Sequence, residues 1–423
     1  MSNVIWGCDV QFDITVPVVV IGAGAAGLIA GLAAHEKGVE VLIVEREASP
    51  SGSTALSSGL IPACGTRWQA AINVVDDVET FSRDIQYKNK KQADELLVHK
   101  ACSLSGEVLH WLVDNHGQQF DLIDSFLYPG HSVHRMHCHP KRTGKALIDS
   151  LVTAVNKAGV DIINSATVTD IFASKTSNIR GIRILRPDGS TEDIGCDSLI
   201  LACNGFGGNS TMVSKYIPEM ADAMYFGHPG NRGDAVNWGV GLGAAIKNMG
   251  AYQGHGSVAI PHGALITWAI MMEGGIQLNS MGSRFSNEHE GYSEQSIKVL
   301  QQPGGIAWNI YDERLHQLGL EFEDYRGALE NGAIKHFASV DELARSIGAS
   351  SEITTSSLED IKAFEIGKKH CPFGRKFQKT EAIEGPPYYG VKVTGALFHT
   401  QGGLAVDTEA KVLRKDNSAL TNL

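Results

Sequence analysis

The sequence predicts an α/β fold built around a Rossmann-like dinucleotide-binding domain. Residues 18–21 form a β-branched run without charge, typical of a strand that is covered on both faces. A G-x-G-x-x-G pattern follows this strand at Gly22, Gly24 and Gly27. Residues 28–37 then predict a helix, and residues 39–44 predict a second parallel strand that leads into Glu45. This order of elements is the dinucleotide-binding fingerprint.

Each glycine of the pattern has a distinct expected task. Gly22 permits the tight turn after the strand, and Gly27 lets the helix pack close to the sheet. Gly24 lets backbone N–H groups approach a pyrophosphate, and we expect Ala25 and Ala26 at the helix start to share this contact. The helix dipole places partial positive charge at the same point.

The acidic residue after the second strand indicates which nucleotide is bound. Glu45 lies close to the roughly 20-residue spacing that the fingerprint expects, and its carboxylate would accept hydrogen bonds from ribose hydroxyls. A carboxylate also repels a 2′-phosphate, so the pattern favours FAD or NAD over NADP. Arg46 is a further candidate for cofactor binding. The alternative is a glycine-rich turn that only packs the helix on the sheet.

Length and composition set wider bounds. A chain of 423 residues is too long for one core and predicts two or three domains. Its 47 glycines are an excess that suits close approach of the backbone to a cofactor. The formal net charge of −11, without any Lys/Arg-rich run, argues against nucleic acid and anionic membrane as partners.

The seven cysteines are scattered and form no C-x-x-C pair. An odd, scattered set predicts reduced thiols in the cytoplasm. The first residues lack the basic start of a secretory signal. The apolar run 17–34 approaches membrane-span length, but the strand–turn–helix pattern explains it better.

A loop of small hydroxyl residues and glycines, residues 51–60, follows the second strand. Here the sequence resembles the flavoprotein subunits of the fumarate reductase and succinate dehydrogenase family and the related 3-ketosteroid dehydrogenases, in which a Gly-Ser-Thr loop lies along FAD. The resemblance implies cofactor contacts from Ser53, Thr54, Ser57, Ser58 and Gly59. Membrane-bound members carry a flavin-linking histidine where this chain has Ser53, so we expect non-covalent FAD.

The next segments are expected to be scaffold. Residues 76–115 predict two amphipathic helices with a buried stripe at Leu96, Leu97, Val98, Leu104, Val108, Leu109 and Leu112. A third helix begins after Thr143 and ends before Gly159. Between these helices the spacing H-x-x-H-x-x-H-C-H, residues 131–139, matches no zinc site that we can justify, and we expect no metal.

Residues 160–208 predict strands separated by a hairpin turn at 187–189: 160–164, 167–172, 179–186 and 198–203. This resembles the family's adenine-side β-meander, which implies that Val168 meets the adenine. Residues 199–209 resemble its second glycine motif, which implies cofactor contacts from Ala202, Asn204 and Gly205. In the family a Gly-Asp pair then opens a helix beside FAD, which makes Asp234 a candidate, although such an aspartate is also a common N-cap.

The remaining chain predicts an inserted lobe and a return. We expect an FAD-binding domain over 1–252, an α+β capping domain over 253–385, and a return to the FAD-binding domain over 386–423. Residues 263–288 resemble the family's most diagnostic run, and residues 397–404 resemble its His-Thr-x-Gly-Gly motif.

The chemistry of the resembling family assigns roles to five residues. Reduction of an alkene next to a carboxylate needs a hydride from the flavin at one carbon and a proton at the other, while charge builds on the carboxylate. The resemblance implies that His255, Thr267 and His399 are donors to that carboxylate. It also implies that Arg284 donates the proton, with Glu288 as the carboxylate that reprotonates it.

The sequence also departs from the family pattern. Trp268 stands where dicarboxylate-reducing members have a glutamate, which suggests a larger substrate with an apolar or aromatic part. Tyr292 falls where ketosteroid dehydrogenases have a catalytic tyrosine. The chain stops at residues 417–423, where the family continues into a strand, a glycine-rich turn and a substrate-clamping arginine. We therefore expect a truncated polypeptide that lacks the C-terminal segment of the FAD-binding domain.

The sequence-based prediction is an FAD-dependent oxidoreductase that forms or reduces a carbon–carbon double bond next to a carboxylate or carbonyl. Its substrate would be a small unsaturated carboxylate or enone, and the sequence does not identify the electron donor or acceptor. The alternatives are a 3-ketosteroid-type Δ-dehydrogenase, an inert FAD binder and an NAD-linked dehydrogenase.

Overall fold

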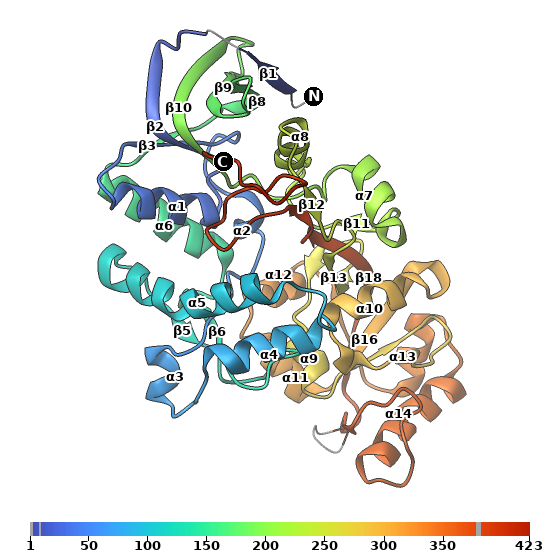
Figure 1. Ribbon diagram of the computed structural model, residues 1–423. Helices are drawn as coiled ribbons and strands as arrows, with labels where there is room; N and C mark the ends of the chain where they lie inside the picture. The colour runs from blue at the N-terminus through green and yellow to red at the C-terminus, as the bar shows by residue number, and fades with distance from the viewer. Residues whose placement is uncertain (1–2, 8–9, 378–381) are drawn as a thin grey trace.

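A computed structural model describes residues 3–7, 10–377 and 382–423, and it contains two large sheets in two lobes (Figure 1). The first sheet has the strand order β1-β8-β9-β10-β2-β3-β7. Its strands are β1 (Asn3–Trp6), β2 (Ile14–Ile21), β3 (Val41–Val44), β7 (Asp161–Ile163), β8 (Thr167–Ala173), β9 (Ile179–Leu185) and β10 (Thr191–Leu201). The predicted strands are all present, but β10 begins at Thr191, seven residues before the predicted start at 198, and β1 was not predicted.

Helices α1 (Ala25–His35) and α6 (Gly144–Ala158) pack together and cover one face of this sheet. The parallel register places Val20 beside Ile43 on one side and beside Ile200 on the other, which explains the uninterrupted apolar run of β2. Helix α6 has the expected ends, because the Thr143 side chain caps its N-terminus and Gly159 adopts φ 79° after its last residue.

The predicted helix pair is also present, as α4 (Val78–Lys88) and α5 (Glu95–His116). The expected buried stripe is only partly right. Leu109 and Leu112 are buried, whereas Leu96 is 73% exposed and Leu104 is 38% exposed. Leu96 lies in the first turn of α5, at the exposed end of the helix. Nearby are α2 (Gly52–Ala55), α3 (Arg67–Ala71) and a small sheet of β4 (Ile61–Pro62), β5 (Asp121–Leu122) and β6 (Met136–Cys138).

The second sheet is mostly antiparallel and forms the core of the other lobe. Its central strand is β18 (Tyr388–Thr400), which pairs with β13 (Tyr252–Ala259), β16 (Ile306–Tyr311), β17 (Ile334–Phe337) and β11 (Met224–Tyr225). Strands β14 (Ala264–Leu265) and β15 (Ile276–Leu278) lie at its edges. Strand β18 begins two residues after the predicted return at residue 386 and belongs to this sheet, and the domain boundaries stay a prediction.

Further helices complete both lobes. They are α7 (Ser210–Tyr216), α8 (Asp234–Gly241), α9 (Ala269–Met272), α10 (Tyr292–Leu300), α11 (Glu313–Gly319), α12 (Glu323–Glu330), α13 (Val340–Ile347) and α14 (Ser351–Glu365), with 3-10 turns at Pro218–Met220, Glu288–Glu290 and Pro303–Gly305. None of the helices in the described ranges is long and apolar enough to cross a membrane.

The last residues lie against the first sheet, near the point where β10 ends (Figure 1). A two-stranded ribbon joins β12 (Ile246–Lys247) to β19 (Gly403–Leu404). Further along, the Asn422 backbone accepts a bond from Leu199 N at 3.0 Å, and its side chain donates to Ile179 O and Asp197 O. These bonds fix the end of the chain to the edge of the β10 hairpin.

Candidate functional site

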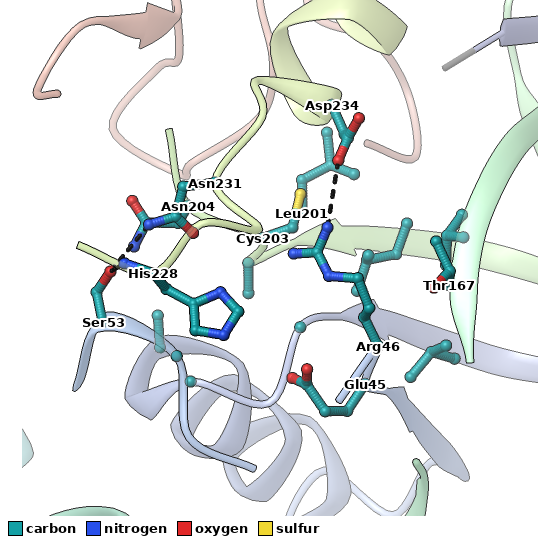
Figure 2. Close-up of a pocket in the computed structure, with 18 of the residues that line it drawn as sticks. Glu45, Arg46, Ser53, Thr167, Leu201, Cys203, Asn204, His228, Asn231 and Asp234 are labelled. Atoms are coloured by element: carbon teal, nitrogen blue, oxygen red, sulfur yellow. Dashed lines mark hydrogen bonds and ion pairs between the residues drawn. The ribbon is translucent and has the colours of Figure 1, made fainter. Parts of the chain in front are cut away.

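A cavity of about 400 Å³ lies where β2, β3 and β10 end, above the N-terminus of α1. Figure 2 shows Glu45 and Arg46 on one side of it and Ser53, His228 and Asn231 on the other. Most of the predicted cofactor residues line it: Gly22, Gly24, Ala25, Ala26, Glu45, Arg46, Ser53, Thr54, Val168, Ala202, Asn204 and Asp234. They come from six separate stretches of the chain.

The three fingerprint glycines differ in what an added Cβ atom would contact. Gly22 has φ 104°, and a Cβ there would lie 2.6 Å from Ala202 O. A Cβ at Gly27 would lie 1.8 Å from Gly22 O, so both positions are required by the protein's own packing. At Gly24 the nearest protein atom to an added Cβ is Thr54 Oγ1, at an ordinary 3.6 Å. Protein packing therefore does not require this glycine, and its predicted task of admitting a pyrophosphate stays a prediction.

The Glu45 carboxylate is fixed by the turn that it faces. Its Oε2 accepts from Ala23 N at 2.8 Å and its Oε1 accepts from Glu47 N at 2.9 Å. Beside it, Arg46 donates to Gly230 O at 2.7 Å and lies 3.9 Å from the Asp234 carboxylate. Asp234 is the first residue of α8, and the N-cap is Gly233, so the N-cap reading of Asp234 is wrong. Asp234 also lines the cavity, and its role in cofactor binding stays a prediction.

The sequence analysis did not identify several residues of this wall. Asn231 donates to Ser53 Oγ at 2.9 Å and to Tyr225 Oη at 2.8 Å, and His228 lies beside the same serine. Both residues come just before the Gly-Asp pair that was used to find Asp234. The tight turn at residues 228–231, with a proline and a glycine, was the available signal.

Five predicted cofactor residues lie outside this wall. Gly27 and Gly59 support packing, since a Cβ at Gly59 would lie 3.0 Å from Gly144 Cα. Gly205 lies against Thr400, whose Oγ1 would be 2.1 Å from an added Cβ. Ser57 and Ser58 line a second cavity instead.

The second cavity, of about 280 Å³, shares Ser53 with the first and extends toward the capping lobe. Three of the residues predicted to hold a substrate carboxylate line it: His255 on β13, Thr267 before α9 and His399 on β18. The structure thus brings the hydroxyl loop that follows Glu45 together with residues more than 200 positions away in the chain.

His255 is held as a neutral hydrogen-bond donor. Its ring stacks on those of Tyr292 and Phe398, with both centroid distances at 5.1 Å, and it is 5% exposed. Ser257 N donates to its Nδ1 at 3.1 Å, so the proton of the neutral ring is on Nε2. Burial lowers the pKa of His255 to about 3 and keeps it neutral at physiological pH.

His399 and Thr267 have polar neighbours of their own. Nε2 of His399 lies 3.1 Å from Gln253 Oε1 and donates to it, and burial lowers the pKa of this imidazole. Thr267 Oγ1 accepts from Ala269 N at 3.3 Å, which leaves its hydroxyl proton for another acceptor.

Arg284 and Glu288 form a buried ion pair away from this wall. Arg284 Nη2 lies 2.6 Å from Glu288 Oε2, and Arg375 Nη1 binds the same oxygen at 3.0 Å. Burial favours a neutral carboxyl, but Arg284 and Arg375 outweigh it and lower the pKa of Glu288 to about 2. Neither Arg284 nor Glu288 is among the described residues that line the second cavity. Their catalytic roles stay predictions.

The second cavity has wall residues that the sequence analysis did not select. Trp268 and Tyr292, which it noted only as departures, both line the cavity, and Trp268 meets His255 edge to face at 5.6 Å. Tyr128, Phe322 and Asp324 also line it. These three lie in segments without any motif, and only the fold brings them to the site.

The histidines at residues 131–139 have scaffold contacts. His137 lies 2.9 Å from Thr66 Oγ1 and 2.9 Å from Arg135 O, and His134 lies 3.1 Å from Phe126 O. His139 accepts a hydrogen bond from Lys141 N. Over the described ranges, no group of three or more His, Cys, Asp or Glu side chains is arranged to hold a metal ion.

The fold and the first cavity define a dinucleotide-binding flavoprotein of the α/β class. Residues 17–423 match the family model described as FAD binding domain, and the chain belongs to this family. The site fits FAD, because the Gly24 cradle, the α1 N-terminus and Glu45 meet at one cavity. The protein is therefore an FAD-dependent oxidoreductase.

Similar proteins point to carbon–carbon double bonds as the site of reaction. The chain is 29% identical to a probable fumarate reductase of Shewanella frigidimarina, over 97% of this chain and 69% of that protein. It is 28% identical to an NADH:fumarate oxidoreductase of Klebsiella pneumoniae, over 95% of this chain but 43% of that protein. A urocanate reductase of Eggerthella lenta is 27% identical, with 96% of this chain and 68% of that protein covered.

Solved structures agree with this fold. A flavocytochrome c3 fumarate reductase in an open conformation superposes with a TM-score of 0.81 at 29% identity, over 98% of this chain and 72% of that one. A 3-ketosteroid-Δ4-(5α)-dehydrogenase from Rhodococcus jostii superposes with a TM-score of 0.77 at 23% identity, over 98% of this chain and 90% of that one. The second likeness concerns the fold alone.

Proposed function

We propose that the protein moves hydride between FAD and a carbon–carbon bond next to a carboxylate or carbonyl, as an enoate reductase or in the reverse direction. One observation carries the proposal: a cavity whose wall joins the hydroxyl loop at Ser53, Ser57 and Ser58 to the donors His255 and His399. When bound, FAD supplies the hydride donor or acceptor.

The donor set suits one end of such a substrate. The Nε2–H of His255 and the hydroxyl of Thr267 are neutral donors on one wall, and His399 lies on the strand next to His255. Neutral donors that are fixed before reaction stabilise negative charge as it develops on a carboxylate or enolate oxygen. We therefore propose that His255 and Thr267 donate to the carboxylate or carbonyl group, and that His399 joins them by exchanging its bond to Gln253 for one to the substrate.

Two residues are candidates for moving the proton. Arg284 was assigned by family resemblance, but Glu288 raises its pKa despite burial, which makes its guanidinium a still weaker acid. The Tyr292 ring lines the cavity against His255, and no described side chain donates to or accepts from its hydroxyl. Geometry favours Tyr292 as the acid and Arg284 as a residue that fixes Glu288.

The cofactor is proposed to be non-covalent. Ser53 occupies the position of the flavin-linking histidine in membrane-bound relatives, and its hydroxyl accepts from Asn231. Denaturation of the purified protein in acid should therefore release all the yellow colour into the supernatant.

The reaction is tested by reducing the purified yellow protein with dithionite without oxygen and then adding an enoate or enone. Return of the oxidised flavin spectrum supports the proposal. If the flavin stays bleached with every acceptor, the protein is an inert binder. A preparation that has no flavin absorbance but binds NAD would instead indicate the NAD-linked alternative.

A 3-ketosteroid-type Δ-dehydrogenase is the second candidate. The observations in its favour are Trp268, which replaces the glutamate of dicarboxylate reducers, and Tyr292 in the cavity wall. His399 argues for an enoate instead, because ketosteroid dehydrogenases generally lack this histidine. Bleaching of the oxidised flavin by a saturated 3-ketosteroid, with no recolouring by enoates, would decide for this candidate.

We also propose a reducing compartment, the cytoplasm. The described cysteines Cys64, Cys102, Cys138, Cys196, Cys203 and Cys371 are all free thiols. Cys8 lies outside the described residues. Fractionation of cells that express the tagged chain would test this placement.

A further inference from the structure

His255 lies next to a β-bulge in the sheet of the capping lobe. At this bulge β13 has two residues, Gly256 and Ser257, opposite the single residue Gly395 of β18. Bulges are common beside active sites, where they change the direction of a side chain or backbone group. Here the Ser257 N–H points at the imidazole and donates to Nδ1 of His255 at 3.1 Å. The bulge therefore decides which ring nitrogen carries the proton.

A single peptide group connects this imidazole to a buried glutamine. The Gly256 carbonyl and the Ser257 N–H belong to the same planar unit, in which they point in opposite directions. Nε2 of Gln277, on β15, donates to the Gly256 carbonyl at 2.7 Å. Because the unit is planar, a bond that fixes the carbonyl also fixes the direction of the N–H. Polarisation along the chain from Gln277 to His255 strengthens both hydrogen bonds.

The carboxamide of Gln277 can adopt one orientation only. A backbone carbonyl accepts and never donates, so Nε2 must face Gly256. The same Nε2 donates to Asn309 Oδ1 at 2.8 Å, and Oε1 accepts from Gln295 Nε2 at 2.8 Å. Asn309 then directs its Nδ2 to Ser257 Oγ, at 2.5 Å. Gln277, Asn309 and Gln295 are all 0% exposed, so no water competes for these bonds.

The bulge has little room to take another shape. A Cβ on Gly256 would lie 2.9 Å from the backbone carbon of Gln295, which shows how closely α10 packs on it. On the other side, the backbone N of Gln277 donates to Glu288 Oε1 at 3.1 Å. The Arg284–Glu288 pair therefore supports the strand from which Gln277 reaches the bulge.

We infer that Gln277 is a positioning residue, whose carboxamide fixes the bulge peptide so that the proton of His255 is held on Nε2. In the other tautomer Nε2 would present a lone pair, which repels a carboxylate or carbonyl oxygen. Gln277 is not among the described residues that line the second cavity, so it acts through His255. The inference deepens the proposed function and rests on it for the use of this N–H as a donor to the substrate.

The protonation pattern of one imidazole tests this inference without any substrate. Purified protein with FAD added and with ¹⁵N in its histidine rings is studied by long-range ¹H–¹⁵N correlation at about pH 8, where the neutral imidazole dominates. Protonated and unprotonated ring nitrogens have separate shifts. The signals of His255 are identified by their loss in His255→Gln. Gln277→Met then removes the carboxamide and keeps a side chain of similar length.

We expect His255 in the wild type to be a single tautomer with the proton on Nε2, and in Gln277→Met to have it on Nδ1 or shared between both nitrogens. Gln69→Met is the matched control. Gln69 is 1% exposed and its Nε2 also makes two bonds, to Asp76 and to His134 O, but it lies in α3 and outside the bulge network. This control should lower the melting temperature and leave the tautomer of His255 unchanged.

The inference is overturned if wild-type His255 carries its proton on Nδ1, a result that needs no variant to fold. It is also overturned if folded Gln277→Met keeps the wild-type tautomer. Under the proposed function, Gln277→Met should also slow enoate-driven flavin reoxidation by about tenfold or more, the usual effect of losing one hydrogen bond to a charged group. Failure of the proposed function gives a different result: the tautomer still changes in Gln277→Met, but no enoate reoxidises the flavin of the wild type.

Discussion

At the scale of single residues, the two proton-donor candidates make opposite predictions. Tyr292 lines the cavity, and Arg284 is fixed to Glu288 by two of its nitrogens, Nε at 3.0 Å and Nη2 at 2.6 Å. A proton donor must reach the substrate, whereas a buried ion-pair partner acts mainly on stability. The same two variants therefore separate catalysis from structure.

We expect Tyr292→Phe to slow enoate-driven flavin reoxidation by about 100-fold or more, the usual effect of losing a general acid, with substrate affinity kept. Arg284→Lys should lower the urea midpoint and leave the rate within about tenfold. Stopped-flow absorbance and equilibrium unfolding check these outcomes. If Tyr292→Phe keeps the full rate and a folded Arg284→Lys loses it, the proton donor is Arg284.

The fingerprint glycines also differ residue by residue. Gly24→Ala should keep the fold, because an added Cβ there would have only an ordinary contact with Thr54 Oγ1, but it should weaken FAD binding by about tenfold or more. Gly22→Ala should lose both fold and cofactor, because of its φ of 104° and the clash with Ala202 O. Thermal melting of the apoprotein and fluorescence titration with FAD separate the two. Gly327→Ala, where an added Cβ meets open space, is the control.

At the scale of elements, a buried arginine fixes the turn that carries two cavity residues. Arg375 donates to Gly275 O at 2.7 Å and to Met271 O at 2.9 Å, and it shares Glu288 with Arg284. Met271 is in α9, the short helix that follows Thr267 and Trp268. Arg375 therefore joins the ion pair to the geometry of the cavity wall.

We expect Arg375→Gln to destabilise the protein by roughly 3–5 kcal/mol, the usual cost of breaking a buried ion pair, and to raise KM for enoates more than it lowers kcat. Urea unfolding and steady-state kinetics check the two parts. A loss of stability without any change in KM would restrict Arg375 to a structural role.

Sequence reasoning located the elements where the signal is local. The glycine turn, Glu45 and the loop at Ser53 all lie within about 40 residues, and their spacing alone brings them together. Arg375 and Asp324 were not found, because their partners are set by packing between distant segments. The i,i+4 spacing of Arg284 and Glu288 also predicts a simple ion pair, and the third member, 87 residues away, has no local signal.

At the scale of the whole molecule, buried histidines make stability depend on pH. Burial lowers the pKa of His255 to about 3 and those of His131, His137 and His289 to about 4. The unfolded chain binds protons at these sites below about pH 6.5, whereas the folded chain does not. Stability should therefore rise with pH between about 4 and 6.5 and be fully present above that range.

We expect the free energy of unfolding to fall between pH 7 and pH 5 by up to about 2 kcal/mol for each of these histidines. Urea denaturation at the two pH values measures this difference. His131→Phe should reduce the pH dependence by about one proton, because it removes one titrating imidazole. This position suits the test, because the buried Nδ1 of His131 has no hydrogen-bond partner among the described residues. Equal pH dependence in the variant and the wild type would contradict this.

The two lobes also differ in how far the sequence predicted them. In the first sheet, the motif with fixed spacing predicted β2 and β3 as parallel strands, whereas β1 and the order of the remaining strands were not predicted. In the second sheet, residues of β18 pair with residues from 51 positions earlier, in β17, to 172 positions earlier, in β11. No periodicity in the sequence predicts such pairings.

The pairing of Tyr252 with Thr400 has a consequence for how such a protein can be assembled. The chain enters the capping lobe near Tyr252 and leaves it near Thr400, and these two residues are paired neighbours in the sheet. A lobe that is attached at two adjacent positions can be replaced by one of different length without moving the strands of the nucleotide-binding lobe. Substrate choice and cofactor binding can therefore be inherited as separate modules.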